Sequence, residues 1–193
     1  MKKTHQTLKY KRRRQGKTDY KARLRLLLSE KHRLVIRKSL KNMIAQLIDY
    51  SKKGDKIIAS ASSRNLEKYG WKSNKGNIPA AYLTGLLIGK KAAKANIKEA
   101  IVDLGLSYGI KGSREYALIK GAQDAGLVIN CPAETAPDEK RLNGSHIAEY
   151  AALLKKENVE SYNRIFSDYL KNKVNPEELT KIFEQVKNKI MAE

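Results

Sequence analysis

The sequence predicts an α/β fold: a mixed sheet with an antiparallel meander and flanking helices, a basic N-terminal arm and a C-terminal helical extension. Three observations carry this prediction. Short runs rich in Ile, Leu and Val alternate with polar breaks early in the chain, as β-strands do. Longer runs with helical periodicity follow them. Lys and Arg crowd the N-terminus. We divide the 193 residues into an arm with a short helix (1–29), an α/β core domain (30–142) and the extension (143–193).

The arm and the helix after it differ in pattern. Residues 1–17 are densely basic and lack apolar periodicity, so we expect them to be extended or disordered in the free protein. Thr18 is a candidate N-cap for a short amphipathic helix with Lys21 and Arg25 on its polar face. The apolar residues at helical spacing are Tyr20, Leu24, Leu27 and Leu28.

Three strand-like segments follow the helix. They are Arg33–Lys38, Met43–Asp49 and Lys56–Ala61, separated by short polar breaks. The break Ser51–Asp55 suits a hairpin connection, and the three segments therefore predict an antiparallel meander.

After a polar loop, a helix and a buried strand are predicted. Asn77 can cap a helix that has Pro79 in its first turn and runs to about Asn96. Gly85 and Gly89 within it predict close packing on the sheet. The apolar run 100–104 fits a strand buried on both faces.

A second helix and a last strand complete the predicted core. Ser113 can cap a helix of about Arg114–Ala125, which Gly126 stops. Leu127–Asn130 reads as a short strand. In the charge-balanced extension, with eight basic and eight acidic side chains, the helical patterns predict two or three helices, and Asn175 followed by Pro176 marks one helix start.

The net charge points to a polyanionic partner. The chain has 40 Lys and Arg against 20 Asp and Glu, a formal charge of +20, and residues 1–41 alone carry sixteen basic and two acidic side chains, a net of +14. A membrane partner is not expected, because the most apolar run, Ile78–Gly89, is shorter than the roughly 20 residues that span a bilayer, and no signal peptide is evident. Cys131, the single cysteine, suits a reducing cytosol.

The segment from Lys9 to Lys17 predicts nucleic-acid binding, because guanidinium groups can grip phosphates while an interleaved Tyr can stack on a base. The competing interpretation is a solvated tail or a localisation signal. RNA is favoured over DNA, since no helix-turn-helix, zinc-finger or zipper pattern is present. The candidate contacts are Lys9, Tyr10, Lys11, Arg12, Arg13, Arg14, Lys17, Lys21, Arg23, Arg25, Arg33, Arg37, Lys38 and Lys41.

Weaker motifs leave alternatives open. Trp71 and Lys72, in a loop, could form an RNA stacking platform or a hydrophobic plug. The glycine-rich stretch 105–112 fits neither dinucleotide nor Walker spacing, and is a structural turn or a secondary phosphate contact through Lys111 and Arg114.

Catalysis and metal binding find little support in the sequence. The three His residues have no metal-ligand spacing, and Cys131 has no evident base partner. Asp49 and Asp103 could hold magnesium in a nuclease, but a two-metal site needs more clustered acids. We therefore expect a non-enzymatic protein without metal or cofactor. The rivals are an enzyme acting on RNA and a module whose arm binds an acidic protein.

Several stretches resemble the large-subunit ribosomal protein eighteen family of archaeal and eukaryotic type. They are YKRRRQGKTDYKARLRLLLS (10–29), RLVIRKS (33–39), IAQLI (44–48), NIPAAYLTGLLIGKKA (77–92), AIVDLGL (100–106) and PDEKRLNGSHIAEYA (137–151). The chain departs from the family's polar, basic run at Ser39–Asn42, which includes Leu40.

The resemblance implies a ribonuclease-H-like topology used as a scaffold without catalysis. It implies a structural constituent of the large ribosomal subunit, located in the cytoplasm, that binds 5S rRNA and anchors it to the large rRNA in the central protuberance beside neighbouring ribosomal proteins. No small-molecule substrate is implied. The contacts carried over by motif are Lys11, Arg12, Arg13, Arg14, Lys17, Tyr20, Arg23, Arg25, Arg33, Arg37 and Lys38.

Overall fold

A four-stranded mixed sheet lies at the centre of the computed structural model, which describes residues 8–193. The strand order is β3-β2-β1-β4. An antiparallel meander is formed by β1 (Arg33–Lys38), β2 (Met43–Asp49) and β3 (Lys56–Ser62), while β4 (Ile101–Asp103) pairs in parallel with β1. The predicted mixed sheet with its antiparallel meander is confirmed.

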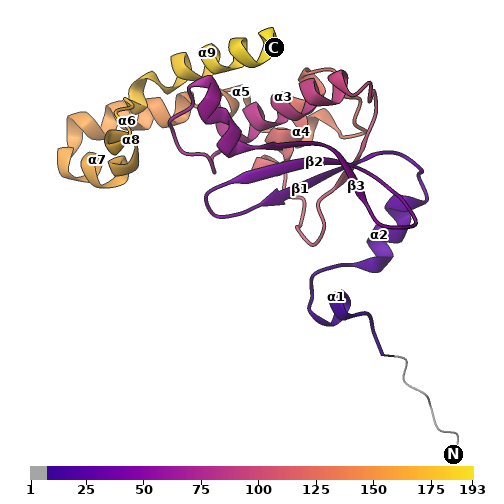
Figure 1. The fold of residues 1–193 in the computed structure, drawn as a ribbon. Coiled ribbons are helices and arrows are strands. Elements are labelled where there is room, and N and C mark those ends of the chain that lie inside the picture. Colours follow the sequence, from indigo (N-terminus) through magenta and orange to yellow (C-terminus); the bar gives the residue numbers. More distant parts are fainter. Residues whose placement is uncertain (1–7) are drawn as a thin grey trace, which may run out of the picture.

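The sheet buries alternate side chains against two helices. Leu34 and Ile36 of β1 and Met43 and Leu47 of β2 are buried in the main core, as expected for residues two apart on one face. Two long helices, α3 (Ile78–Lys94) and α4 (Arg114–Asp124), cover that face (Figure 1).

The two helices pack at very short range, and glycines make this possible. The predicted cap of α3 is confirmed, with the Asn77 side chain accepting a hydrogen bond from the backbone N–H of Ala80 at 3.0 Å. A Cβ at Gly85 would lie 2.0 Å from the carbonyl oxygen of Leu118, and one at Gly121 would lie 2.1 Å from that of Tyr82. The small residues of α3 therefore contact α4, and not the sheet as the sequence suggested.

The predicted strand Leu127–Asn130 is wrong. Val128 makes one isolated parallel bridge to Glu99, through N–H donation to Lys98 and acceptance from Ala100. The ladder cannot continue because the chain turns at Cys131 and then reaches Pro132, which has no N–H to donate.

The N-terminal elements lie apart from the helical face. A single helical turn, α1 (Lys11–Arg14), and the short helix α2 (Tyr20–Leu27) lie beyond one end of the sheet (Figure 1). The expectation of an extended or disordered arm is thus wrong for 11–14. Residues 8–10 and 15–17 lie outside helices and strands, and residues 1–7 fall outside the described residues.

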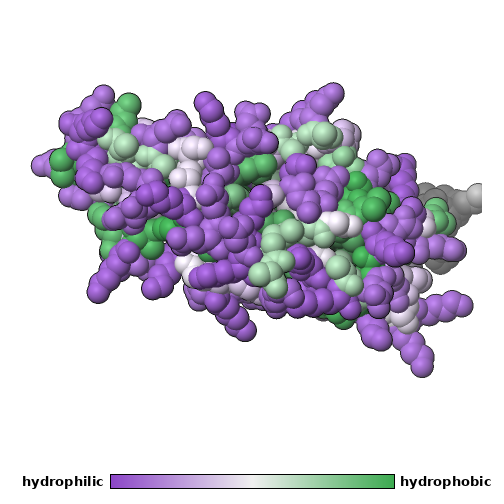
Figure 2. Space-filling view, turned by 90° about the horizontal axis from the view of Figure 1, so that it is seen from above, coloured by the Kyte–Doolittle hydropathy of each residue, from purple (hydrophilic) through white to green (hydrophobic). Residues whose placement is uncertain are grey.

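The C-terminal extension contains more helices than expected. The last helix, α9 (Leu179–Ala192), returns along α3 (Figure 1). There the Phe183 and Tyr82 ring centroids lie 5.7 Å apart, and Lys90 Nζ donates to the Met191 carbonyl at 2.8 Å. Seen from above, this face is mainly hydrophilic, with apolar residues in small patches (Figure 2). The remaining helices are α5 (Glu139–Leu142), α6 (Ser145–Glu157), α7 (Val159–Ile165) and α8 (Ser167–Lys171), with 3₁₀ turns η1 (Ser63–Tyr69), η2 (Ala133–Thr135) and η3 (Pro176–Glu178).

Candidate nucleic-acid interface

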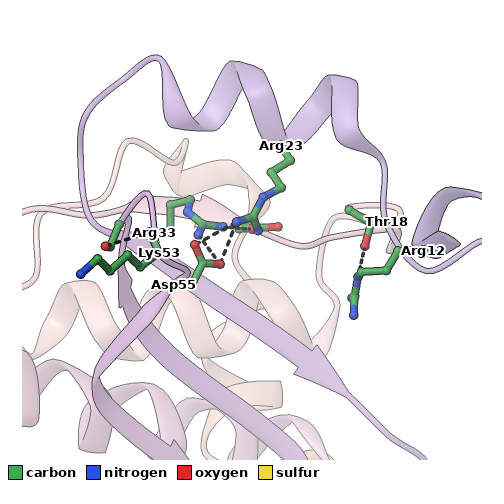
Figure 3. Close-up of polar contacts among 8 residues, drawn as sticks. Arg12, Thr18, Arg23, Arg33, Lys53 and Asp55 are labelled. Atoms are coloured by element: carbon green, nitrogen blue, oxygen red, sulfur yellow. Dashed lines mark hydrogen bonds and ion pairs between the residues drawn. The ribbon is translucent and has the colours of Figure 1, made fainter. Parts of the chain in front are cut away.

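The turn α1 presents four consecutive cations to solvent. Lys11, Arg12, Arg13 and Arg14 are all exposed, and α1 buries no residue. Four successive side chains on one helical turn point in all directions around it, so they form a ring of charge. The Arg12 Nε–H donates to Thr18 Oγ1 at 2.8 Å and ties this turn to the start of the next helix (Figure 3).

An aromatic pair joins the arm to α2. The Tyr10 and Tyr20 ring centroids lie 5.0 Å apart with planes tilted by 42°, a geometry that contributes about 0.5–1.5 kcal/mol when well packed. Tyr10 nevertheless remains 72% exposed, which leaves much of its ring available to a base.

The helix α2 begins at Asp19, and not at Thr18 as the sequence suggested. The Asp19 carboxylate accepts hydrogen bonds from the N–H groups of Lys21 at 2.9 Å and Ala22 at 3.2 Å, and a carboxylate is the stronger cap at a positive helix end. Thr18 instead accepts the bond from Arg12.

The inner face of α2 differs from the predicted apolar stripe. Leu24 and Leu28 are 59% and 75% exposed, whereas the neighbours turned toward the core are partly buried. Those neighbours are Ala22, Arg23, Leu26 and Leu27. A charged residue therefore occupies the middle of the face that packs on the core.

Arg23 begins a chain of alternating charges that crosses the sheet (Figure 3). Its Nη2 donates to both oxygens of Asp55, at 2.8 and 2.9 Å. Arg33 Nη2 lies 2.8 Å from the same carboxylate, and Arg33 Nη1 donates to Asp103 at 3.0 Å. Burial by itself raises the pKa of Asp55, but the hydrogen bonds from the two arginines outweigh it and hold that pKa below its ordinary value.

Arg33 is therefore not available to contact RNA. The side chain is only 1% exposed and is enclosed between two carboxylates, so it cannot reach a phosphate without leaving a buried charge unpaired. Its role is structural: it joins the first strand to β4 and to the hairpin that leads into β3.

Lys38, at the other end of β1, is also engaged within the protein. Its Nζ lies 2.8 Å from Oε1 of Glu115, which is almost fully buried. Glu115 also accepts hydrogen bonds from Ser107 at 2.5 Å and Ser113 at 3.0 Å. Burial raises the pKa of Glu115, but these partners, Lys38 foremost, bring it below its ordinary value. This network holds the loop after β4 against the sheet, and the Lys38 side chain remains 38% exposed.

A cleft of about 910 Å³ separates the arm and α2 from the core. Arg12, Lys17, Arg25 and Arg37 line it, together with the Asp55 and Asp103 carboxylates that the arginine network neutralises and the Asp19 cap. Tyr20 and Tyr116 add aromatic surface. Such a cleft combines positive charge with rings, which is the combination that tracks a phosphate backbone and stacks on bases.

Nine cations along this region form no ion pair with any residue from 8 to 193. We call them the basic face. They are Lys9, Lys11, Arg12, Arg13, Arg14, Lys17, Lys21, Arg25 and Arg37, and all are exposed. Nine of the predicted contacts are thus exposed and unpaired within residues 8–193, and four of the nine share the cleft, whereas Arg23, Arg33 and Lys38 are paired with internal carboxylates.

Three candidates lie away from the cleft. Lys41 is exposed in the turn between β1 and β2, at the end of the sheet far from α2 (Figure 1). Lys72 is exposed in the loop after η1. Trp71 beside it is completely buried, with its Nε1–H donating to the Asn74 carbonyl at 3.1 Å. Trp71 is therefore a hydrophobic plug, and the prediction that it contacts RNA is wrong.

Metal and nuclease sites find no support in the described part of the chain. Residues 8–193 contain no cluster of three or more His, Cys, Asp or Glu able to hold a metal ion. Asp103 is bound to Arg33 and to the Gly105 N–H, while Asp49 lies 3.6 Å from His32. Arg114, the possible phosphate contact, donates to the Gly76 carbonyl at 2.7 Å. None of the helices described is long and apolar enough to cross a membrane.

Asp55 is the residue of this region that the sequence did not reveal. It lies in a polar stretch that reads only as a hairpin, 32 residues from Arg23. The one available signal is that an acid follows two lysines in a chain short of acids, and this does not identify a partner.

Two comparisons with known proteins agree on one family. The sequence model of the family described as "Ribosomal large subunit proteins 60S L5, and 50S L18" matches residues 3–101. The large ribosomal subunit protein uL18 of Methanococcus maripaludis is 50% identical over 182 residues, which cover 94% of each chain.

Proposed function

The chain belongs to the L5 and L18 family of large ribosomal subunit proteins, and from this premise we propose that it binds 5S rRNA and anchors it to the large rRNA in the central protuberance. As a member of this family it is a structural constituent of the large ribosomal subunit, and not an enzyme. An rRNA partner and neighbouring ribosomal proteins follow from the same membership.

The observation that carries the proposal is the basic face. Its nine exposed cations form no ion pair within residues 8–193, and four of them line a cleft that also holds Tyr20 and Tyr116. These four are Arg12, Lys17, Arg25 and Arg37. Cations that are not neutralised within the protein are free to displace the counterions of an RNA backbone, and this displacement drives association. Tyr10, which directly precedes α1 and is 72% exposed, is available to stack on an unpaired base.

Shape is expected to supply the selectivity. The basic face spans α1, the link to α2, the outer side of α2 and the end of β1, and the backbone bends between these elements (Figure 1). A folded RNA with matching curvature can neutralise the charges of this face together, whereas a flexible single strand must first be ordered. The proposal therefore predicts a preference for folded 5S rRNA over RNA of equal length and scrambled sequence.

The anchoring role needs a second RNA contact. Lys41 and Lys72 are exposed and lie outside the cleft, which makes them candidates for the large rRNA. The charge-balanced extension packs on the core through α9 and suits contacts with neighbouring ribosomal proteins better than with RNA.

A competition experiment tests the proposal. Labelled 5S rRNA bound to the full chain is challenged with unlabelled 5S rRNA and with a scrambled RNA of the same length, at several salt concentrations. We expect the scrambled RNA to compete at least tenfold less well. Equal competition would reduce the function to general RNA binding, and failure of the full chain to retain labelled 5S rRNA at any salt concentration would favour the protein-binding alternative.

A further inference from the structure

We infer that Asp55 is a positioning residue for the proposed RNA interface: through Arg23 it fixes α2, and with it the basic face, against the core. This inference rests on the function proposed above. It concerns a carboxylate that would not itself touch RNA.

The apolar hold on α2 is weak. No residue of α2 is fully buried, and Leu24 and Leu28 are mostly exposed. The helix has only eight residues, a length that is marginal in water without tertiary contacts. A polar contact must therefore contribute much of what orients α2.

The bond between Arg23 and Asp55 is suited to that task. One guanidinium nitrogen donates to both carboxylate oxygens at 2.8 and 2.9 Å, and both side chains are largely buried, with Arg23 32% and Asp55 26% exposed. A charge-assisted bond of this kind is stronger than one between neutral groups, and partial burial shields it from salt. The bond also fixes the rotation of α2 about its axis. Arg23 lies on the face of α2 opposite Lys21 and Arg25, so holding Arg23 against the core turns these two cations toward solvent.

Asp55 is rigid because the core holds it in turn. Arg33, 1% exposed, lies 2.8 Å from the second Asp55 oxygen and is fixed on its other side by Asp103 at 3.0 Å. Through Asp55 and Arg33, α2 is therefore held in a fixed position relative to β1, a central strand of the sheet, and β4, an edge strand. If the Asp55 carboxylate were free in solvent, it could not hold α2 in one position.

Whether removal of the Asp55 charge strengthens or weakens RNA binding distinguishes the positioning role from a purely electrostatic one. Replacing Asp55 by Asn raises the formal net charge by one, which on long-range electrostatics alone strengthens RNA binding or leaves it unchanged. If Asp55 instead occupied Arg23 in competition with a phosphate, its removal would also strengthen binding. A positioning role predicts weaker binding.

The principal test compares Asp55→Asn with Asp49→Asn in the full chain. Asp49 lies at the end of β2 and is 53% exposed. Its ion-pair partner is His32 and not a residue of α2, and its replacement changes the net charge identically. We expect Asp55→Asn to weaken 5S rRNA binding by about five- to twentyfold, the range of one charge-assisted bond, and Asp49→Asn to change it by less than about twofold. Asp55→Glu should recover part of the loss.

Hydrogen exchange supplies a readout that loss of global stability would not reproduce. In Asp55→Asn the amides of α2 should exchange faster, while those of β1 and β2 stay protected. Arg23→Gln removes the same contact and leaves both Arg33 ion pairs in place, so it carries the test even where Asp55→Asn fails to fold. It should loosen α2 and weaken binding without changing the salt slope, whereas loss of a direct phosphate contact lowers that slope by about one.

The double variant completes the design. If Arg23 acts through Asp55, Arg23→Gln together with Asp55→Asn should bind no worse than the weaker single variant. Equal or tighter binding by Asp55→Asn, unchanged α2 exchange, or additive losses would overturn the inference. Absence of 5S rRNA binding by the unaltered protein would instead overturn the proposed function, so the two failures are distinguishable.

Discussion

Neutralising the three consecutive arginines of α1 tests the basic face most directly. The variant Arg12→Gln, Arg13→Gln, Arg14→Gln keeps the side chains polar, although shorter, and removes three of the nine charges. Folding should be almost unaffected, because α1 buries nothing and only the hydrogen bond from Arg12 to Thr18 is lost, which contributes less than about 1 kcal/mol at an exposed site.

The magnitude follows from the number of free cations. If all nine meet phosphates, log K should fall with log salt at a slope of about 6 to 8, taking roughly 0.7 to 0.9 for each contact. Removing three of them should bring the slope to about 4 to 5. The reduction of about 2 to 3 units is large compared with the precision of a salt titration.

Filter binding of labelled 5S rRNA across a salt series measures this slope. A matched control carries Lys156→Gln, Lys171→Gln and Lys173→Gln, which remove the same charge from exposed positions of the C-terminal extension. Its slope should stay within about one unit of the unaltered protein. Equal slopes for both triple variants would mean that only net charge matters, and would refute the assignment of the contacts to this face.

Three further predictions concern the fold that presents the basic face. Gly85→Ala should lower the free energy of unfolding by about 2–4 kcal/mol in urea denaturation, because the added Cβ would lie 2.0 Å from the Leu118 carbonyl oxygen; a loss below 0.5 kcal/mol would contradict the tight crossing. The single Trp71, being fully buried, should show blue-shifted fluorescence that 5S rRNA does not quench; quenching at saturation would restore the stacking interpretation. The Lys38 ion pair and the serines hold the pKa of Glu115 below its unfolded value, so the stability that this group contributes is complete above about pH 4.5 and is lost as the pH falls through its folded pKa. The difference in urea midpoint between the unaltered protein and Glu115→Gln should therefore shrink from pH 7 to pH 3, and a constant difference would exclude this linkage.

The fold could be predicted where the information is local. The strands of the meander and the two core helices follow from periodicity and from caps such as Asn77, whose side chain bonds the third residue along. Prediction failed where the structure of a segment depends on residues that are distant in the sequence. Leu127–Asn130 has the composition of a strand, but only one of its residues reaches a neighbouring backbone before Pro132 ends the pairing.

The candidate site was likewise predictable only as far as local sequence determines it. Counting charges predicted an RNA-binding surface, yet it could not distinguish Arg33 from Arg37, which lie four residues apart on the same side of one strand. Arg33 is buried between Asp55 and Asp103, while Arg37 is exposed beside the cleft. Only the tertiary arrangement determines which cations remain free, because both acids are distant in sequence.

The outer side of β3 has a consequence for handling the isolated protein. Among residues 8–193 no strand pairs with that side, and the strand exposes Ile57 and Ile58. An unpaired strand of this kind can recruit another copy. Mutual repulsion between molecules of charge +20 opposes such contacts in RNA-free solution. A polyanion added in small amounts weakens that repulsion before every copy has found its own RNA, so turbidity should peak with protein in excess and clear when RNA is supplied first.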